Sequence, residues 1–414
     1  MGWPYIPFTP ICCFILAMGG VTMGVSLSYC SPALPQIQEE FHLSSTEATC
    51  FNVMSPVCGM IGCIICSFLT GRIGRRWCTF ICAVFTFLTW IFLALPKVFW
   101  LLMLLRCLNG FSLGFFSSVT PIFIVEVAPP RYTGLFGYMH QLGTAFGYWY
   151  PNLVGNTVSA WRDVTYICSI PSGILMLGSL FISDRVGPTK GASYGKVFKY
   201  KKQMLIAMFI LLIQQFSGIN ALQSNLRTIL SEARISNASI IETMATVCQI
   251  LTTIAASFIV DRWGRRNCWI LSTVLQFIAF LLLAIQQIAQ TNGALFIVGL
   301  FVEQLSYGFG MGPIPFLVVA ELYPEEVRSA SMALMTVTCW LFAAVVMLIW
   351  PVMEESLTVG YCFLVFSIIS IVALLFGISQ IDNKKAPKKE EEDLIANEEE
   401  EKESSETAKA LKEI

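Results

Sequence analysis

Residues 71–77 read GRIGRRW, and 190 positions later residues 261–267 read DRWGRRN. A second pair of segments repeats at an offset of 195: EVAPPR at residues 126–131 and ELYPEEVR at residues 321–328. Self-similarity at one period indicates a repeated structural unit. The sequence therefore predicts two similar halves, each with the same order of helices and loops.

Apolar segments flank these loops, and each is long enough to cross a bilayer as a helix of about 20 residues. Twelve such segments, numbered here as spans 1–12, lie near residues 6–29, 50–70, 77–95, 99–125, 133–154, 163–183, 203–226, 240–260, 268–288, 294–320, 330–352 and 358–380. The first could instead be a signal peptide, but residues 1–10 contain no Lys or Arg to form a basic leader. We expect an all-α integral membrane protein with twelve transmembrane helices in two pseudo-symmetric six-helix bundles.

The composition supports a membrane protein. Of the 414 residues, 56% are hydrophobic and 13% are charged, and the mean hydropathy is +0.69. Soluble domains contain about 25% charged residues, so this composition excludes a soluble domain. The predicted units are a bundle over residues 1–183, a short basic cytoplasmic linker over 184–202, a second bundle over 203–381 and a charged tail over 382–414. With 12 acidic and 7 basic residues, the tail is expected to be mostly disordered.

The basic residues predict the orientation, because Lys and Arg near membrane spans stay in the cytoplasm. If both termini are cytoplasmic, the inner connections hold 14 Lys and Arg residues, the tail holds 7, and the outer connections hold 4. The sequon Asn237-Ala-Ser then falls outside, where Asn237 could carry a glycan. We expect a multi-pass plasma-membrane protein with both termini in the cytoplasm.

No residue pattern points to an enzyme, a cofactor, a metal site or a nucleic-acid partner. The 15 cysteines lie almost entirely in apolar spans, where packing is their ordinary use. Neither of the two histidines, His42 and His140, belongs to a recognisable acid–base or metal-binding set.

The repeated loops combine a glycine that permits a tight turn with arginines and a nearby carboxylate. Ion pairs between these groups would close the inner face when the protein opens outward and break when it opens inward; the alternative is that the arginines act only as topology signals. The candidate gate residues are Arg72, Arg75, Arg76, Glu126, Arg131, Arg262, Arg265, Arg266, Glu321 and Arg328.

With these motifs, the chain resembles the sugar porters of the major facilitator superfamily, especially the facilitative hexose transporters. The resemblance covers about residues 5–380. Besides the loops above, it rests on Arg106, HQL at residues 140–142, QQFSGIN at residues 214–220, and GPIP at residues 312–315. It implies the major facilitator fold, alternating access and a sugar as the transported molecule.

The same resemblance implies the substrate-binding residues, which are Gln141, Gln214, Gln215, Asn220, Gln249, Phe316 and Trp340. The amides would hydrogen-bond sugar hydroxyls, Trp340 would stack on the sugar ring, and Phe316 stands where many relatives have Trp. Side-chain amides are costly inside a membrane unless they face a wet cavity or join helices, and they offer the donor and acceptor pairs that a sugar needs. The alternative is that these amides form hydrogen bonds between helices in a transporter of another solute. Gly218 can break the helix so that Gln214 and Asn220 both point inward.

Three classes of function therefore remain open, and the first of them, sugar transport, has two possible mechanisms. We expect a transporter of a monosaccharide, a glucose-like hexose, by facilitated diffusion. The alternatives are a major facilitator transporter of another small polar solute, a proton-coupled sugar symporter, and a sugar sensor that does not transport. Proton-coupled relatives carry an Asp after the tyrosine of span 1, whereas Cys30 follows Tyr29 here, which favours a uniporter. Glu303 in span 10 is the residue that could overturn this expectation, although a structural role is favoured for it. The sequence does not specify the oligomeric state.

Overall fold

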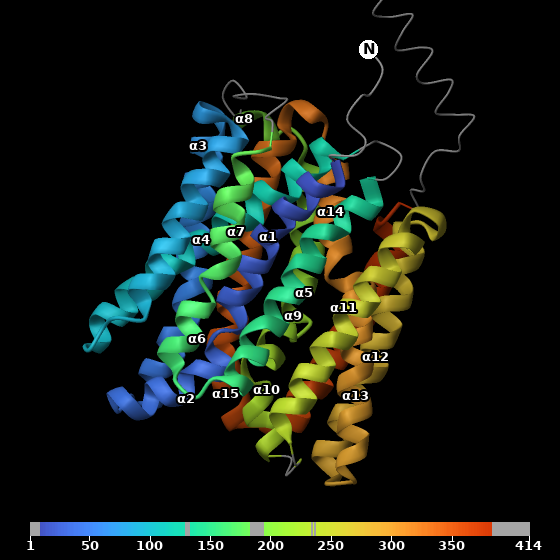
Figure 1. The fold of residues 1–414 in the computed structure, drawn as a ribbon. Coiled ribbons are helices and arrows are strands. Elements are labelled where there is room, and N and C mark those ends of the chain that lie inside the picture. Colours follow the sequence, from blue (N-terminus) through green and yellow to red (C-terminus); the bar gives the residue numbers. More distant parts are fainter. Residues whose placement is uncertain (1–8, 129–132, 183–193, 233–234, 236, 383–414) are drawn as a thin grey trace, which may run out of the picture.

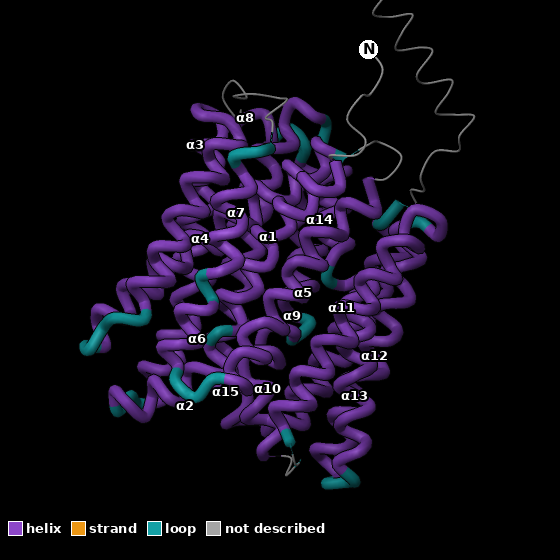
Figure 2. Tube along the Cα trace, in the orientation of Figure 1, coloured by secondary structure: helices purple, strands orange, loops and turns teal. Residues whose placement is uncertain are grey.

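A computed structural model describes residues 9–128, 133–182, 194–232, 235 and 237–382. This part of the chain consists of helices joined by short loops, with no β-strand among the described residues (Figure 2). The helices run side by side along the length of the molecule, and α2, α10 and α13 reach the end opposite to α8 (Figure 1).

Each half of the chain forms six membrane crossings. The first half comprises α1 (Thr9–Ser28), α2 (Cys30–Phe41), α3 (Ser45–Leu93), α4 (Phe99–Val127), α5 (Thr133–Thr157), α6 (Trp161–Ile167) and α7 (Ile170–Ser179). After the short α8 (Tyr194–Val197), the second half comprises α9 (Lys201–Phe216), α10 (Ile219–Glu232), α11 (Ala238–Trp263), α12 (Arg265–Ala289), α13 (Gly293–Ser306), the π-helix η2 (Tyr307–Met311), α14 (Pro313–Leu322) and α15 (Glu325–Gln380).

Eight helical segments of the described residues are long and apolar enough to cross a membrane. Two of them, with 49 and 51 residues, have about twice the length that one crossing needs. α3 therefore supplies spans 2 and 3, and α15 supplies spans 11 and 12. With α5 as span 5, and α6 with α7 as span 6, the segments are consistent with the twelve predicted spans.

The glycines of the repeated loops adopt backbone conformations that other residues avoid. Gly74 interrupts α3 with φ 79°, and Gly264 separates α11 from α12 with φ 88°. Gly218 separates α9 from α10 with φ 86°. Positive φ is readily populated by glycine alone, so the predicted turns and the predicted break in span 7 are confirmed.

Large apolar side chains cover the outer surface of the bundle. Ile64 and Phe68 on α3 are each 58% exposed, and Phe258 on α11 is 63% exposed. Contiguous apolar surface of this kind is rare on proteins that face water, but it is the surface that lipid tails solvate. The chain is thus a multi-pass integral membrane protein.

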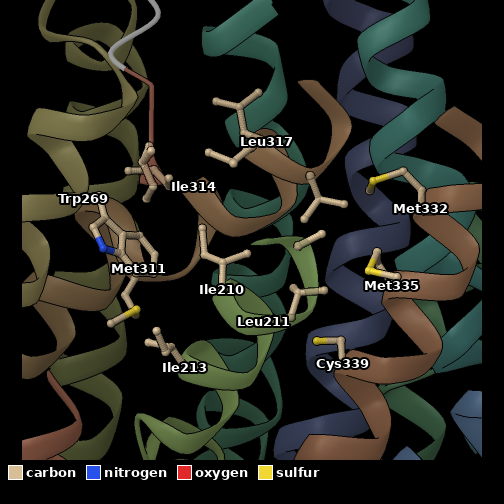
Figure 3. Close-up of a cluster of buried hydrophobic side chains, with 14 of the residues drawn as sticks. Ile210, Leu211, Ile213, Trp269, Met311, Ile314, Leu317, Met332, Met335 and Cys339 are labelled. Atoms are coloured by element: carbon tan, nitrogen blue, oxygen red, sulfur yellow. The ribbon is translucent and has the colours of Figure 1, made fainter. Parts of the chain in front are cut away.

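Buried apolar side chains pack the interior of the second half, and helices of the two halves also lie against each other. One apolar cluster joins α9, span 10 and α15 through Ile210, Ile314 and Met335, and Figure 3 shows these side chains converging from the three segments. Between the halves, α5 lies along α11, and α3 lies along α15.

An ion pair within the first half stabilises the face opposite the repeated arginine loops. Arg162 Nη2 lies 2.6 Å from Glu40 Oε1, and Trp161 Nε1 donates to Glu40 Oε2 over 2.7 Å. The hydrogen bond from Arg162 lowers the pKa of the Glu40 carboxyl. Because both groups are partly exposed, the pair stabilises the fold only modestly.

Candidate binding site and inner gate

Four glutamines and an asparagine that were predicted from the sequence lie in the interior of the bundle. The exposed fractions are 5% for Gln141, 1% for Gln214, 6% for Gln215, 8% for Asn220 and 0% for Gln249. They come from α5, α9, α10 and α11, so both halves contribute. Burying five amides inside a membrane protein is unfavourable unless their polar atoms find partners.

A break in span 10 explains the position of Gln214. Pro315 has no N–H and cannot donate to the carbonyl of Met311, four residues earlier. Gln214 Nε2 donates to Met311 O over 3.0 Å and to Gly312 O over 2.9 Å. Gln214 therefore holds the irregular segment η2 and the start of α14 in place, which is the interhelical use that the sequence left open.

Gln141 and Gln249 contact the same irregular segment at its two central glycines. A Cβ atom at Gly312 would lie 2.9 Å from Gln141 Nε2, and one at Gly308 would lie 3.3 Å from Gln249 Cγ. Gln141 Nε2 and both polar atoms of the Gln249 side chain are buried without a hydrogen-bond partner in the protein. Buried polar groups are nearly always satisfied, so these three atoms are suited to bind a molecule that enters the protein.

Gln215 and Asn220 form a second polar group beside this segment. Asn220 Nδ2 donates to Gln215 Oε1, and Gln215 Nε2 donates to Cys339 Sγ over 2.9 Å. The break at Gly218 places both amides on the interior side of span 7. A thiol is a weak acceptor, so an incoming hydroxyl oxygen can replace it at little cost.

Two aromatic residues were also predicted to line the site. Trp340 is 4% exposed, and its Nε1 donates to Ser117 Oγ over 2.8 Å, which joins span 11 to span 4 of the other half. Phe316 is half-buried and packs against the apolar cluster of the second half. The orientation of the Trp340 ring is thus fixed by a hydrogen bond across the two halves.

A cavity of about 480 Å³ opens at the end of the bundle away from the arginine loops. Its polar lining includes Ser31, Asn52, Ser224 and Asn225. Ser224 lies one helical turn beyond Asn220 on α10, so the cavity reaches down toward the central amides. We call this cavity the outer vestibule.

At the opposite end, the predicted gate residues form matching ion pairs in each half. Arg75 pairs with Glu126, and Arg265 Nη2 lies 3.2 Å from Glu321 Oε1. Arg76 donates to the carbonyl of Leu180, and Arg266 donates to that of Ile378. Each loop is thereby tied to the inner ends of two other spans of its own half.

One contact of this network crosses between the halves. Asp261 Oδ1 lies 3.1 Å from Arg265 Nη1, and Asp261 Oδ2 accepts a hydrogen bond of 3.1 Å from the backbone N–H of Leu135, in the first turn of α5. A carboxylate at a helix N-terminus is favoured by the helix dipole. Asp261 was not predicted as a gate residue, because the matching position of the first loop is Gly71.

The remaining predicted gate arginines lie apart from these ion pairs. Arg72 is exposed, with its guanidinium 4.0 Å from the ring centre of Phe68. Arg262 is exposed, and Arg328 is half-buried on α15. Arg131 lies outside the described residues.

Glu303 and Arg106 are buried charged residues within the spans. Glu303 and Gln304 are fully buried, and Gln304 joins Glu303 to Gln223 through hydrogen bonds of 2.8 and 3.1 Å. Arg106 donates to Ser26 O over 2.8 Å and to Cys30 Sγ over 3.3 Å. Glu303 Oε2 thus accepts a hydrogen bond from the amide of Gln304, whereas Glu303 Oε1 is buried without a hydrogen-bond partner.

The sequence did not point to Ser117 or Tyr307 as residues of this region. The ring of Tyr307 lies so close to Gly312 that it would touch a Cβ atom there. A serine among the small residues of span 4 gives no signal of its own, and a tyrosine in an apolar span is common. Asn237 is exposed at the start of α11, at the same end of the bundle as the outer vestibule.

Comparison with known families gives a match over nearly the whole chain. Residues 12–186 and 185–385 each match the family described as "Sugar (and other) transporter".

Individual relatives carry related names. "Sugar transporter ERD6-like 1" of Arabidopsis thaliana is 26% identical over 413 aligned positions, which cover 87% of this chain and 88% of the relative. "Solute carrier family 2, facilitated glucose transporter member 8" of Bos taurus is 25% identical, with coverage of 90% and 91%.

Solved structures show the same fold. The proton:xylose symporter XylE bound to 6-bromo-6-deoxy-D-glucose superposes with a TM-score of 0.80 at 18% identity, over 92% of this chain and 98% of that chain. The inward open conformation of XylE from E. coli superposes with a TM-score of 0.74 at 18% identity, over 94% and 99%. The arrangement of the twelve spans is therefore that of the major facilitator fold.

Proposed function

The chain belongs to the family of sugar (and other) transporters, and from this premise we propose that it carries a monosaccharide across the membrane by facilitated diffusion. The family consists of transporters and not of enzymes. Its members with this fold work by alternating access, in which two bundles rock about a central site.

The observation that carries the proposal is the set of unpartnered amide atoms below the outer vestibule. Gln141 Nε2 and both polar atoms of Gln249 lie beside the break in span 10. Amides donate and accept hydrogen bonds without carrying charge, and this matches the hydroxyl groups of a neutral sugar. A vestibule of about 480 Å³ leads toward them and is larger than a monosaccharide needs.

The names of the relatives support a sugar as the substrate, and one of them supports a hexose. One relative is named a facilitated glucose transporter and others are named sugar transporters. We propose Gln141, Gln214, Gln215, Asn220, Gln249, Phe316 and Trp340 as the residues that contact the sugar. For Gln214 this contact would add to its bonds with span 10.

We also propose the orientation. The ion-paired arginine loops would lie at the cytoplasmic face, with both termini, and the outer vestibule and Asn237 would face outward at the plasma membrane. The excess of Lys and Arg in the inner connections supports this assignment.

Proton symport is the second candidate, because Glu303 is a fully buried carboxylic acid in span 10 and one structural relative is a proton:xylose symporter. The hydrogen bonds from Gln223 through Gln304 to Glu303 favour a structural role. Cys30 beside Arg106 replaces the acid of span 1, and an ordinary thiol, with a pKa of about 8.5, is a poor proton carrier at neutral pH.

Liposomes that contain the purified protein distinguish the two candidates. With equal D-glucose or D-xylose on both sides and an inward proton gradient, facilitated diffusion gives no net accumulation. Glu303→Gln, which keeps the size of the side chain, should leave the downhill rate within about twofold. Accumulation above equilibrium that Glu303→Gln abolishes would identify a symporter instead.

A further inference from the structure

Glu242 forms a hydrogen bond between the two halves at the outer end of the molecule. Ser31 Oγ, on α2, donates to Glu242 Oε1, on α11, over 2.7 Å. Ser31 lies in the wall of the outer vestibule, and Glu242 is 1% exposed. The bond joins α2 of one half to α11 of the other.

A second contact between the two halves lies at the same end of α11. Asn156 Nδ2, near the end of α5, donates to Thr243 Oγ1 over 3.1 Å and to Ser239 O over 3.4 Å. Ser239, Glu242 and Thr243 occupy the first two turns of α11. Two helices of the first half therefore hold the outer end of one helix of the second half.

The other end of α11 is also attached to the first half, through the bond from Leu135 N to Asp261 Oδ2. Helices α5 and α11 are thus joined near both of their ends in this structure. Rocking of the halves that widens the outer end must separate α11 from α2 and α5 there, whereas the inner contact can remain.

We propose that Glu242 and Ser31 form an outer latch that holds the halves together above the central site and sets how often that site opens outward. This inference rests on the proposed function, because it assigns the latch to the alternating-access cycle. A carboxylate suits a reversible latch for two reasons. It is a strong acceptor for the Ser31 hydroxyl when both are buried. Once the halves part, water from the vestibule hydrates the carboxylate and offsets the lost bond.

Cys339 provides a native reporter for this opening. Its thiol lies at the central site, bonded to Gln215, and is 1% exposed. A membrane-impermeant maleimide added outside reaches this thiol only when the outer end opens. Mass spectrometry of the peptide that contains Cys339 separates its labelling from that of the other cysteines.

The experiment compares labelling rates at Cys339, without sugar, in intact cells that express each variant. Ser31→Ala removes the bond to the Glu242 carboxylate, and Glu242→Ala removes it together with the other interaction of that side chain, so we expect labelling to rise by roughly tenfold to a hundredfold. Glu242→Gln keeps an acceptor oxygen and should give a smaller increase. The double variant should match Glu242→Ala, because Ser31→Ala removes only the bond that Glu242→Ala has already removed.

Glu40→Gln is the matched control, since Glu40 is also an outer carboxylate but is bonded to Arg162 and Trp161 within its own half. Its labelling rate should not change. Unchanged labelling in Ser31→Ala, a small substitution that is expected to fold, would overturn the latch, as would additive effects in the double variant. The labelling needs no sugar, so a chain that fails to transport sugar but shows these shifts would retain the latch while losing the proposed function.

Discussion

Replacing Gln249 with methionine is expected to weaken the apparent affinity for the transported sugar by roughly 5- to 100-fold while leaving the protein at least as stable. The loss in affinity follows from two hydrogen bonds, each contributing about 0.5–1.5 kcal/mol. The stability follows because neither polar atom of Gln249 has a partner in the protein. Removing an unsatisfied buried polar group while conserving volume is close to neutral or stabilising. Affinity is measured from the concentration dependence of uptake, and stability from thermal unfolding in detergent.

Gln276 offers a control of the same chemistry. Gln276 is also fully buried, and both of its polar side-chain atoms lack a hydrogen-bond partner. It lies on α12, which packs against span 10 but carries none of the proposed sugar-binding residues. Gln276→Met should give a similar change in stability with no change in sugar affinity. Equal affinity losses in the two variants would show that the loss at Gln249 comes from packing and not from sugar contacts.

Neutralising Arg265 is expected to shift the resting population toward the inward-open state by tenfold or more. Arg265 is 5% exposed, and its removal leaves the carboxylates of Asp261 and Glu321 without their shared cation. Removing one partner of a buried ion pair costs about 3–5 kcal/mol. Much of this cost destabilises the state in which the inner face is closed. Only in that state does Asp261 also accept the hydrogen bond from the start of α5. Glu321→Gln should shift the population in the same direction by less, since Asp261 still pairs with Arg265.

Labelling of Cys339 from each side of the membrane checks this prediction. Inside-out vesicles of Arg265→Gln should react faster than those of the parent, and intact cells should react more slowly. Arg262→Gln, an exposed arginine of the same loop, should behave like the parent. Equal labelling of Arg265→Gln and the parent from both sides would leave the arginines as topology signals only, and faster labelling from the outer face would reverse the proposed orientation.

The sequence predicted the features that depend on local rules or on the repeat. Gly74, Gly264 and Gly218 mark breaks because glycine alone adopts positive φ readily, and the repeated loops required two similar halves. The burial of the central amides could be predicted because polar side chains in membrane spans need an interior position.

Apart from the ion pairs of the inner gate, pairings between distant residues could not be predicted. The bond of Ser31 to Glu242 joins positions 211 residues apart, and neither residue belongs to a recognisable pattern. The gate ion pairs connect each loop to its own half, while contact with the other half passes through Asp261. The bonds of Gln214 with Met311 and Gly312 depend on how span 10 bends at its prolines, which only the packed structure determines.

Counterflow in liposomes tests facilitated monosaccharide transport most directly. Liposomes that contain the purified protein are loaded with an unlabelled hexose or pentose and diluted into a trace of the same labelled sugar, with no ion gradient. Facilitated transport predicts a transient uptake of label above equilibrium for at least one monosaccharide, and Gln249→Met should reduce it at subsaturating sugar. The absence of such a transient for every sugar of the panel, from protein that remains folded, would contradict a monosaccharide transporter.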